Sequence, residues 1–112
     1  MLIYKIFRPA EWDMLQREGE TRGAPIDLTD GYIHFSTAET VRETAEKHFA
    51  GAGDLILAWV EADRLADDLR WEISRGGVAF PHLYRVLRMG DVAGHAQLPE
   101  QEGVHVFPEG IA

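Results

Sequence analysis

The stretch that most constrains this chain is residues 54–61, Asp-Leu-Ile-Leu-Ala-Trp-Val-Glu, the most apolar run in its 112 residues. Gly51 and Gly53 lie just before it and stop a preceding helix. A short, unbroken apolar run of this kind is typical of a buried strand. We therefore predict that residues 54–61 form the central strand of a sheet.

Around this run the sequence shows several short strand patterns and only two long helical patterns, both in the first half. The first helix is predicted to begin at Pro9, which a first helical turn tolerates, and to end at Gly19. The second is predicted to begin at Ser36, which forms a capping box with Glu39, and to continue to about Phe49. Strand propensity marks residues 2–7, the segment around residue 33, and residues 69–74, 83–87 and 95–98. Residues 62–68 are predicted to form a short turn-and-helix segment, and residues 88–92 a short turn. The pattern predicts an α+β fold, with a mostly antiparallel sheet and two main helices.

Residues 20–31 lie between the first helix and the next strand. They are polar and rich in turn formers, with Gly23, Pro25, Asp27 and Gly31 among them. A connection of about a dozen residues is long for a simple link between elements. We therefore predict a functional loop here.

The length and composition indicate one domain over residues 1–112, with a loosely packed tail after about residue 99. Within that tail, residues 104–107 are predicted to return as an edge strand. Hydrophobic residues make up 46% of the chain, which is enough to bury a core without a metal or a disulfide. The chain contains no Cys, so disulfides and thiolate nucleophiles are excluded.

The charge balance narrows the choice of partners. Nineteen acidic residues against 11 basic ones give a formal net charge of -8, which repels phosphate backbones. We therefore predict no binding to nucleic-acid polymers, although a local basic patch can still hold one nucleotide. No apolar run reaches the roughly 18 residues that a bilayer span needs, and Met1–Lys5 resembles a first strand more than a signal peptide. We expect no membrane partner and a cytoplasmic location.

The segment Asp30–Thr37 carries the first candidate site residues. Side chains alternate along a strand, so His34 and Ser36 project from one face while the apolar residues between them enter the core. An imidazole at a strand end can orient a ribose hydroxyl or exchange a proton near neutral pH. We predict a catalytic role for His34, with a buried structural histidine as the alternative. Ser36 is predicted to cap the helix and to contact the same ligand.

Residues 80–84, Phe-Pro-His-Leu-Tyr, repeat the His-x-hydroxyl spacing. Pro81 bends the backbone and can aim His82 at a cleft, where we predict a second catalytic histidine. Tyr84 is predicted to bind the ligand by stacking on a planar ring. The competing interpretation is a surface histidine beside a tyrosine at the edge of the core.

Residues 69–72, Leu-Arg-Trp-Glu, place a carboxylate beside two large side chains that are common in recognition sites. Trp71 is predicted to lie in the core, which turns Glu72 to the opposite face and toward the site as a third catalytic residue. Arg70 and Thr37 complete the predicted ligand-binding set. The alternative for Glu72 is a solvated strand residue.

The five histidines and the carboxylates supply ligand types that zinc accepts. No pair has the His-x3-His or His-Glu-x2-His spacing, and we predict no metal site. His48 lies on the apolar stripe of the second predicted helix, where a histidine at the edge of the core is expected.

The three segments 30–37, 69–72 and 80–84, in this order, resemble the signatures of a small bacterial family, domain of unknown function 952. The resemblance covers most of the chain, from Tyr4 to Leu87. It implies an ADP-ribosyltransferase-like fold, an α+β arrangement with a split antiparallel sheet. In ADP-ribosyltransferases that carry a strand histidine, this histidine binds a ribose of NAD, a tyrosine stacks on nicotinamide and a glutamate polarises the ribose. The resemblance assigns the first role to His34 and offers Tyr84 and Glu72 for the other two.

Three functions remain open at this point. The first is an ADP-ribosyltransferase-like protein that binds NAD or another ribose-containing nucleotide as ligand or substrate around His34. The second is a non-catalytic module that binds a metabolite or a protein in the same cleft. The third is a metal-free phosphoesterase that uses His34 and His82 as base and acid, although Tyr84 departs from the Ser or Thr expected after its second histidine. The sequence leaves the oligomeric state undetermined.

Overall fold

A computed structural model describes residues 1–111 of the chain, except for the side chain of Arg75. The helices are α1 (Pro9–Glu18), α2 (Pro25–Asp30) and α3 (Val41–His48), with short 3-10 segments at η1 (Ala62–Asp68), η2 (Arg75–Gly77) and η3 (Met89–Asp91). The strands are β1 (Leu2–Phe7), β2 (Glu20–Thr21), β3 (Ile33–His34), β4 (Leu55–Glu61), β5 (Leu69–Ile73), β6 (Ala79–Leu83), β7 (Leu87–Arg88), β8 (Val92–Leu98), β9 (Glu100–Gln101) and β10 (Val104–His105). All strand pairings among the described residues are antiparallel, which confirms the α+β prediction.

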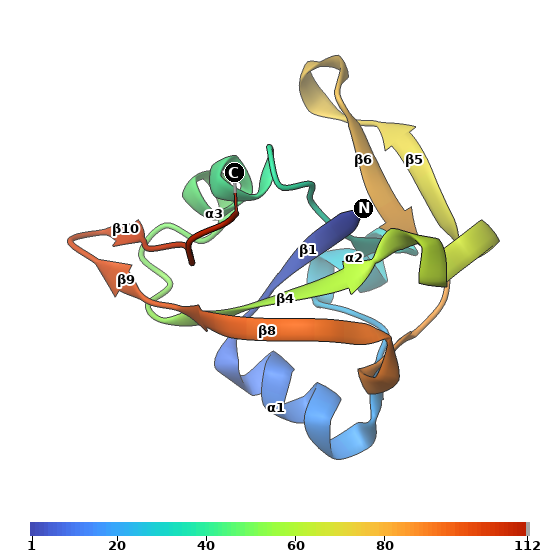
Figure 1. Cartoon of the computed structure of the whole chain (residues 1–112), viewed down its shortest axis with the longest axis horizontal. Helices are drawn as coiled ribbons and strands as arrows, with labels where there is room; N and C mark the ends of the chain where they lie inside the picture. The colour runs from blue at the N-terminus through green and yellow to red at the C-terminus, as the bar shows by residue number, and fades with distance from the viewer. Residues whose placement is uncertain (112) are drawn as a thin grey trace.

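The predicted central strand is confirmed as β4, which lies between β1 and β8 in a three-stranded sheet (Figure 1). Alternate residues of β4 enter two different cores, because side chains alternate between the faces of a sheet. Ile56, Ala58 and Val60 join one core, while Leu55 and Leu57 join the other. Burial on both faces explains why the run is continuously apolar.

Each face of this sheet is covered by a different group of elements. The first core holds residues from α1 and from the second sheet, including Trp12, Leu15, Ile33, Phe35 and Leu83. The second core lies under α3 and holds Tyr4, Ile6, Val41, Ala45 and Leu98. The fold therefore has one central sheet between two apolar layers.

A second three-stranded sheet has the order β3-β6-β5. One isolated pair connects it to the first sheet: Tyr4 and Ser36 exchange two backbone hydrogen bonds, with N···O distances of 2.7 and 2.8 Å. The two sheets part on either side of this pair. The β5–β6 hairpin extends away from the body of the molecule (Figure 1).

The prediction that residues 20–31 form a polar loop is wrong, because this segment contains β2 and α2. Pro25 is the first residue of α2, and Asp27 accepts the N–H of Ala24 at 2.8 Å, which satisfies a donor at the helix start. Gly31 ends the helix with φ of 86°, a conformation that glycine adopts without strain. Local capping therefore made a helix out of residues whose composition is typical of a loop.

The second predicted helix begins later than expected. Ser36 is not its N-cap, since α3 starts at Val41 after a turn in which the N–H of Thr37 donates to Thr40 Oγ1. The backbone of Ser36 is committed to Tyr4, which keeps it in an extended conformation. The expected strand 83–87 is also misplaced, because pairing with β5 ends at Leu83 in β6.

The segment after residue 99, predicted as a loosely packed tail, forms the β9–β10 hairpin, and residues 104–105 pair within it. The carboxylate of Glu100 accepts the N–H groups of Gly51 and Gly53 at 2.8 and 3.2 Å. Buried His105 donates through Nε2 to the carbonyl of Gly53 at 2.8 Å. Phe107 and Ile111 pack against the second core. These contacts hold the segment against the turn before β4.

We predict that Gly94→Ala destabilises the fold, whereas Gly90→Ala does not. Gly94 lies opposite Trp59 in the β4–β8 pair, and a Cβ at Gly94 would lie 2.6–2.7 Å from the Trp59 ring. Because Trp59 packs against the second core, its ring has little room to move, and overpacking of this kind costs about 1–3 kcal/mol. A Cβ at Gly90 would meet no atom within 4 Å. Urea denaturation of the two variants measures the difference, and equal stabilities would contradict the prediction.

Candidate ligand-binding cavity

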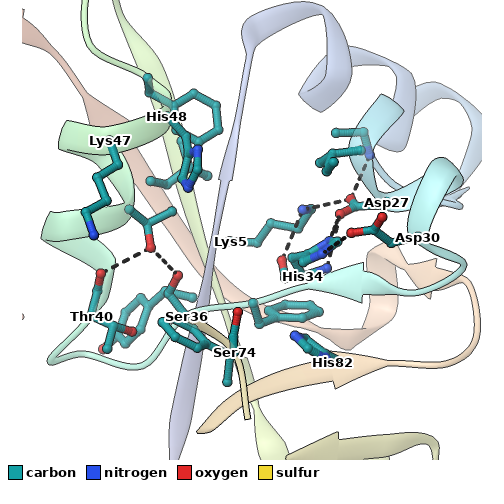
Figure 2. Close-up of a pocket in the computed structure, with 18 of the residues that line it drawn as sticks. Lys5, Asp27, Asp30, His34, Ser36, Thr40, Lys47, His48, Ser74 and His82 are labelled. Atoms are coloured by element: carbon teal, nitrogen blue, oxygen red, sulfur yellow. Dashed lines mark hydrogen bonds and ion pairs between the residues drawn. The ribbon is translucent and has the colours of Figure 1, made fainter. Parts of the chain in front are cut away.

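A cavity of about 780 Å³ lies between α3 and the α2–β3 segment. Figure 2 shows Thr40 and Lys47 on one side of β1, and Asp27, Asp30 and His34 on the other. Cavities of about 300–1,000 Å³ are typical of small-molecule sites. The charged and titratable side chains of the lining include Lys5, Arg8, Glu11, Asp27, Asp30, His34, Glu43, Lys47, His48 and His82, and Ser36 is among its hydroxyls.

The cross-strand pair His34 and His82 forms the centre of one end of the cavity. The two residues lie directly opposite each other in β3 and β6, and their ring centroids are 5.3 Å apart. Opposite residues of an antiparallel pair project from the same face, so both imidazoles reach the same space. Pairing between β3 and β6 thus brings together two histidines that are 48 positions apart in the sequence.

The carboxylate of Asp27 fixes the orientation of His34 through hydrogen bonds to its backbone N–H and to Nδ1. It is fully buried and accepts four hydrogen bonds or ion-pair contacts: from the Ala24 N–H at 2.8 Å, the His34 N–H at 3.1 Å, His34 Nδ1 at 2.6 Å and Lys5 Nζ at 3.0 Å. Burial alone would raise the pKa of Asp27. The bond from His34 and the charge of Lys5 outweigh it and lower the pKa to about 2.

The second ring nitrogen of His34, Nε2, lies 2.9 Å from Oδ2 of Asp30 at the end of α2. Both nitrogens therefore face carboxylates, and only a doubly protonated imidazole can donate to both at once. In this arrangement His34 is a hydrogen-bond donor. Because Asp30 is only partly buried, a ligand oxygen can replace its carboxylate at Nε2.

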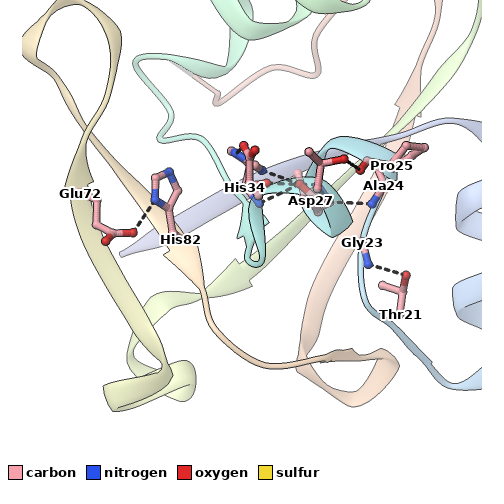
Figure 3. A network of polar contacts seen from close by, with 11 residues as sticks. Thr21, Gly23, Ala24, Pro25, Asp27, His34, Glu72 and His82 are labelled. Atoms are coloured by element: carbon pink, nitrogen blue, oxygen red, sulfur yellow. Dashed lines mark hydrogen bonds and ion pairs between the residues drawn. The ribbon is translucent and has the colours of Figure 1, made fainter.

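His82 has its own carboxylate partner. Its Nδ1 lies 2.7 Å from Oε1 of Glu72, and the hydroxyl of Tyr84 donates to the same oxygen at 2.6 Å. The hydrogen bonds from Tyr84 and His82 lower the pKa of Glu72. The hydrogen bond to Glu72 raises the pKa of Tyr84. The other ring nitrogen of His82 points away from Glu72 (Figure 3). Glu72 and Tyr84 thus orient a buried imidazole whose ring lines the cavity.

Tyr32 links the two histidines through its ring. The ring stacks on His82 with centroids 4.1 Å apart and lies 4.7 Å from the ring of His34 and 5.2 Å from that of Tyr84. These contacts restrict the rotation of all three neighbours. They provide an aromatic wall at this end of the cavity.

The opposite end of the cavity is lined by α3 and the start of α1. Ser36 and Thr44 share a hydrogen bond between their hydroxyls at 2.9 Å. The guanidinium of Arg8 lies over the ring of Phe49 at 4.8 Å, and Lys47 pairs with Glu43 at 2.6 Å. The carboxylate of Glu11 lies 3.8 Å from Arg8. This end therefore offers hydroxyls, an aromatic face and two cations, each with a carboxylate beside it.

Of the predicted site residues, the structure places His34, Ser36 and His82 on the cavity wall. Glu72 and Tyr84 do not line the cavity. Glu72 is hydrogen-bonded to His82, which does, and Tyr84 donates to Glu72. Besides Tyr84, two further predicted ligand contacts lie outside the lining. Arg70 sits over the ring of Tyr84 at 5.2 Å, and Thr37 turns back to Thr40.

Two predictions of burial are wrong. Trp71 is 44% exposed, because β5 is an edge strand of a hairpin that leaves the body of the fold. His48 is exposed near the end of α3 and lines the cavity, so it does not lie at the edge of the core. In both cases the predicted strand or helix is present, but less of the protein packs against these side chains than the sequence pattern indicates.

Sequence reasoning missed Lys5, Asp27 and Tyr32 as parts of the site. A signal for Asp27 was present, since Pro25 followed by an acidic residue at the third helical position marks a helix start. Lys5 interrupts an otherwise apolar strand, which indicates a buried charge with a partner. Tyr32 showed no signal of its own beyond its place beside His34.

Within residues 1–111, no group of three or more His, Asp or Glu side chains is arranged to hold a metal ion. In the same part of the chain, no helix combines the length and the apolar character needed to cross a membrane.

We predict that Asp27→Asn removes part of the acid sensitivity of folding. A carboxylate with a pKa of about 2 in the folded state and 3.8 in its ordinary state stabilises the fold above about pH 4. This contribution, about 2 kcal/mol for such a shift, is lost as the pH falls from about 4 to about 2. Urea denaturation across this range should therefore show a shallower loss for Asp27→Asn than for the native chain. Glu43→Gln, which breaks an exposed ion pair, is the control and should change the slope little. Identical slopes for Asp27→Asn and the native chain would contradict the prediction.

Comparison with known proteins identifies the relatives of this chain. The crystal structure of protein CC0527 from Caulobacter crescentus has 48% sequence identity and a TM-score of 0.91, with 95% of this chain and 94% of that chain covered. The solution NMR structure of CC0527 has 49% identity and a TM-score of 0.83, with 92% and 90% covered. No curated protein matches the chain.

The family comparison agrees with the resemblance noted in the sequence. The model of the family described as "Protein of unknown function (DUF952)" matches residues 6–95, which include β3, β5, β6 and the pair His34 and His82. The match covers more than half of the chain, and the chain therefore belongs to the DUF952 family.

Proposed function

We propose that this protein binds a ribose-containing nucleotide, with NAD as the first candidate, in the cavity between α3 and β3. The observation that carries the proposal is the pair His34 and His82, whose oriented rings lie 5.3 Å apart on the wall of a cavity of about 780 Å³. Buried, oriented polar groups on the wall of a largely preformed cavity are typical of small-molecule sites.

The distribution of charge in the cavity supports a ligand with both signs of charge. Asp30 lies at the histidine end, while Arg8 and Lys47 lie at the other end. Each of these two cations is paired with a glutamate of the lining, Glu11 or Glu43. NAD carries a cationic nicotinamide ring and an anionic diphosphate, which these two ends complement. Lys47 pairs with Glu43 on the surface, and such exposed pairs are weak enough to exchange for a phosphate.

The side chains at the histidine end supply the contacts that a ribose and a planar base require. The His34 Nε2–H can donate to a ribose hydroxyl in place of Asp30. The ring of Tyr32 provides an apolar surface beside it. Glu72 acts through His82 in this proposal, since its carboxylate accepts from that imidazole.

We also propose that the two sheets are the halves of an ADP-ribosyltransferase-like split sheet. Support comes from their antiparallel pairing and from their connection through the single pair Tyr4 and Ser36, beside the cavity. In this arrangement β3, which carries His34, borders the space between the halves.

A metal-free phosphoesterase is the second candidate, and the spacing of the histidine rings favours it. Each imidazole has a carboxylate on Nδ1, which suits an acid–base pair. Asp30 on Nε2 of His34 works against a free base there, and the same contact suits a non-catalytic binding module. Assays of phosphodiester hydrolysis and of NAD cleavage, run with and without EDTA, distinguish the nucleotide-binding protein, the phosphoesterase and the non-catalytic module.

We expect calorimetry with NAD, ADP-ribose and AMP to detect binding by at least one of them, unchanged by EDTA. His34→Ala should weaken that binding by about 1–3 kcal/mol, the cost of an unpaired polar group. His95→Ala is the matched control, because His95 packs on Trp12 and lies outside the cavity lining. Absence of binding by all three ligands, or binding abolished by EDTA, would refute the proposal.

A further inference from the structure

Strand β5 forms an open edge of the second sheet. Its pairing partner is β6, and no other strand pairs with it in the part of the chain that the structure describes. Figure 1 shows the β5–β6 hairpin projecting from the molecule. A regular edge strand with unpaired backbone groups is a template for pairing with another chain.

The hydrogen bonds of β6 show which backbone groups of β5 face outward. The carbonyl of Pro81 accepts the N–H of Phe35 at 3.0 Å, so the β6 backbone at Pro81 faces β3. Pro81 lies opposite Trp71, and the two residues therefore form a pair without hydrogen bonds between them. The N–H and C=O groups of Trp71 point away from β6. By the same alternation, those of Leu69 and Ile73 point outward as well.

The side chains on one face of this edge are apolar and exposed. Trp71 is 44% exposed and Ile73 is 71% exposed, and they project from the same face because they are two residues apart. Leu69, on that face too, is partly buried against the first core. Exposed apolar side chains beside unpaired backbone groups indicate a surface that another strand covers.

The sequence of β5, Leu-Arg-Trp-Glu-Ile, is complementary to itself in the antiparallel direction. About a two-fold axis at Trp71, Arg70 lies opposite Glu72 and Leu69 opposite Ile73. The opposite charges fall on pairs without hydrogen bonds, where facing side chains come closest. We propose that β5 pairs with β5 of a second copy of this chain in this register, which joins the two β3-β6-β5 sheets into one.

Charge selects this register over its neighbours. A slip by two residues in one direction places Arg70 opposite the partner subunit's Arg70, and a slip in the other direction places Glu72 opposite the partner subunit's Glu72. Like charges directly opposite each other destabilise a strand pair. The dimer also brings the partner subunit's Arg70 to the carboxylate that orients His82, so that the histidine ends of the two cavities lie on one continuous sheet.

Sedimentation equilibrium from about 10 µM to about 1 mM tests the proposal, because this range covers weak strand-pairing interfaces. The native chain should dimerise within it. Arg70→Glu and Glu72→Arg each place like charges opposite at both symmetric pairs, so each variant should raise the dimer dissociation constant about tenfold or more. An equimolar mixture of the two variants places opposite charges together again. It should form heterodimers within about threefold of the native dissociation constant.

Circular dichroism and thermal melting show whether each variant is folded. If Glu72→Arg does not fold, Ile73→Asp replaces it and should also weaken the dimer, because it removes an exposed apolar side chain from the proposed interface. Leu28→Asp is the control: Leu28 is 60% exposed and belongs to α2, which is not part of the β3-β6-β5 sheet, so the dissociation constant should stay unchanged. A native chain that is monomeric at all concentrations overturns the proposal. So does a folded Arg70→Glu variant that dimerises like the native chain.

Discussion

The buried carboxylate of Asp27 is the interaction on which the candidate site depends. Removing a charge from water costs several kcal/mol unless partners replace the lost hydration. Lys5 of β1, the Ala24 N–H and both donors of His34 provide those partners. One side chain of α2 thereby ties α2 to β1 and to β3. Gly23 is required beside it, because a Cβ at that position would lie 2.3 Å from the Asp27 carboxylate.

The cavity follows from the way in which the two sheets meet. Within residues 1–111 their backbones pair only at Tyr4 and Ser36, and both of these residues line the cavity. Continued pairing would close the space between the sheets, since paired strands lie only about 4.8 Å apart. Because the pairing stops after one pair, the space between the sheets stays open, with Thr40 and Lys47 on one side of β1 and Asp27 and His34 on the other (Figure 2).

The two histidines are held by carboxylates of different character. Asp27 is fully buried and rigidly bonded, whereas Glu72 is partly exposed and lies on the edge strand β5. The orientation of His34 is therefore fixed by the core. The orientation of His82 depends on Glu72 of β5, the strand that our proposed dimer would cover. Glu72 therefore takes part both in the candidate site and in the proposed dimer contact.

The sequence by itself determined the features that depend on local pattern: the apolar strand β4, the helix from Pro9 to Gly19, the α+β class, and His34 and His82 as polar residues on strands. Tertiary structure decided the rest. Ser36 carried a valid capping signal, but its backbone pairs with Tyr4 from a distant strand. Trp71 matched a core strand, yet an edge strand has no layer to cover it. The partnership of Lys5, Asp27 and His34 joins three separate elements, and no local pattern contains it, because burial makes those charges depend on neighbours that only the folded chain supplies.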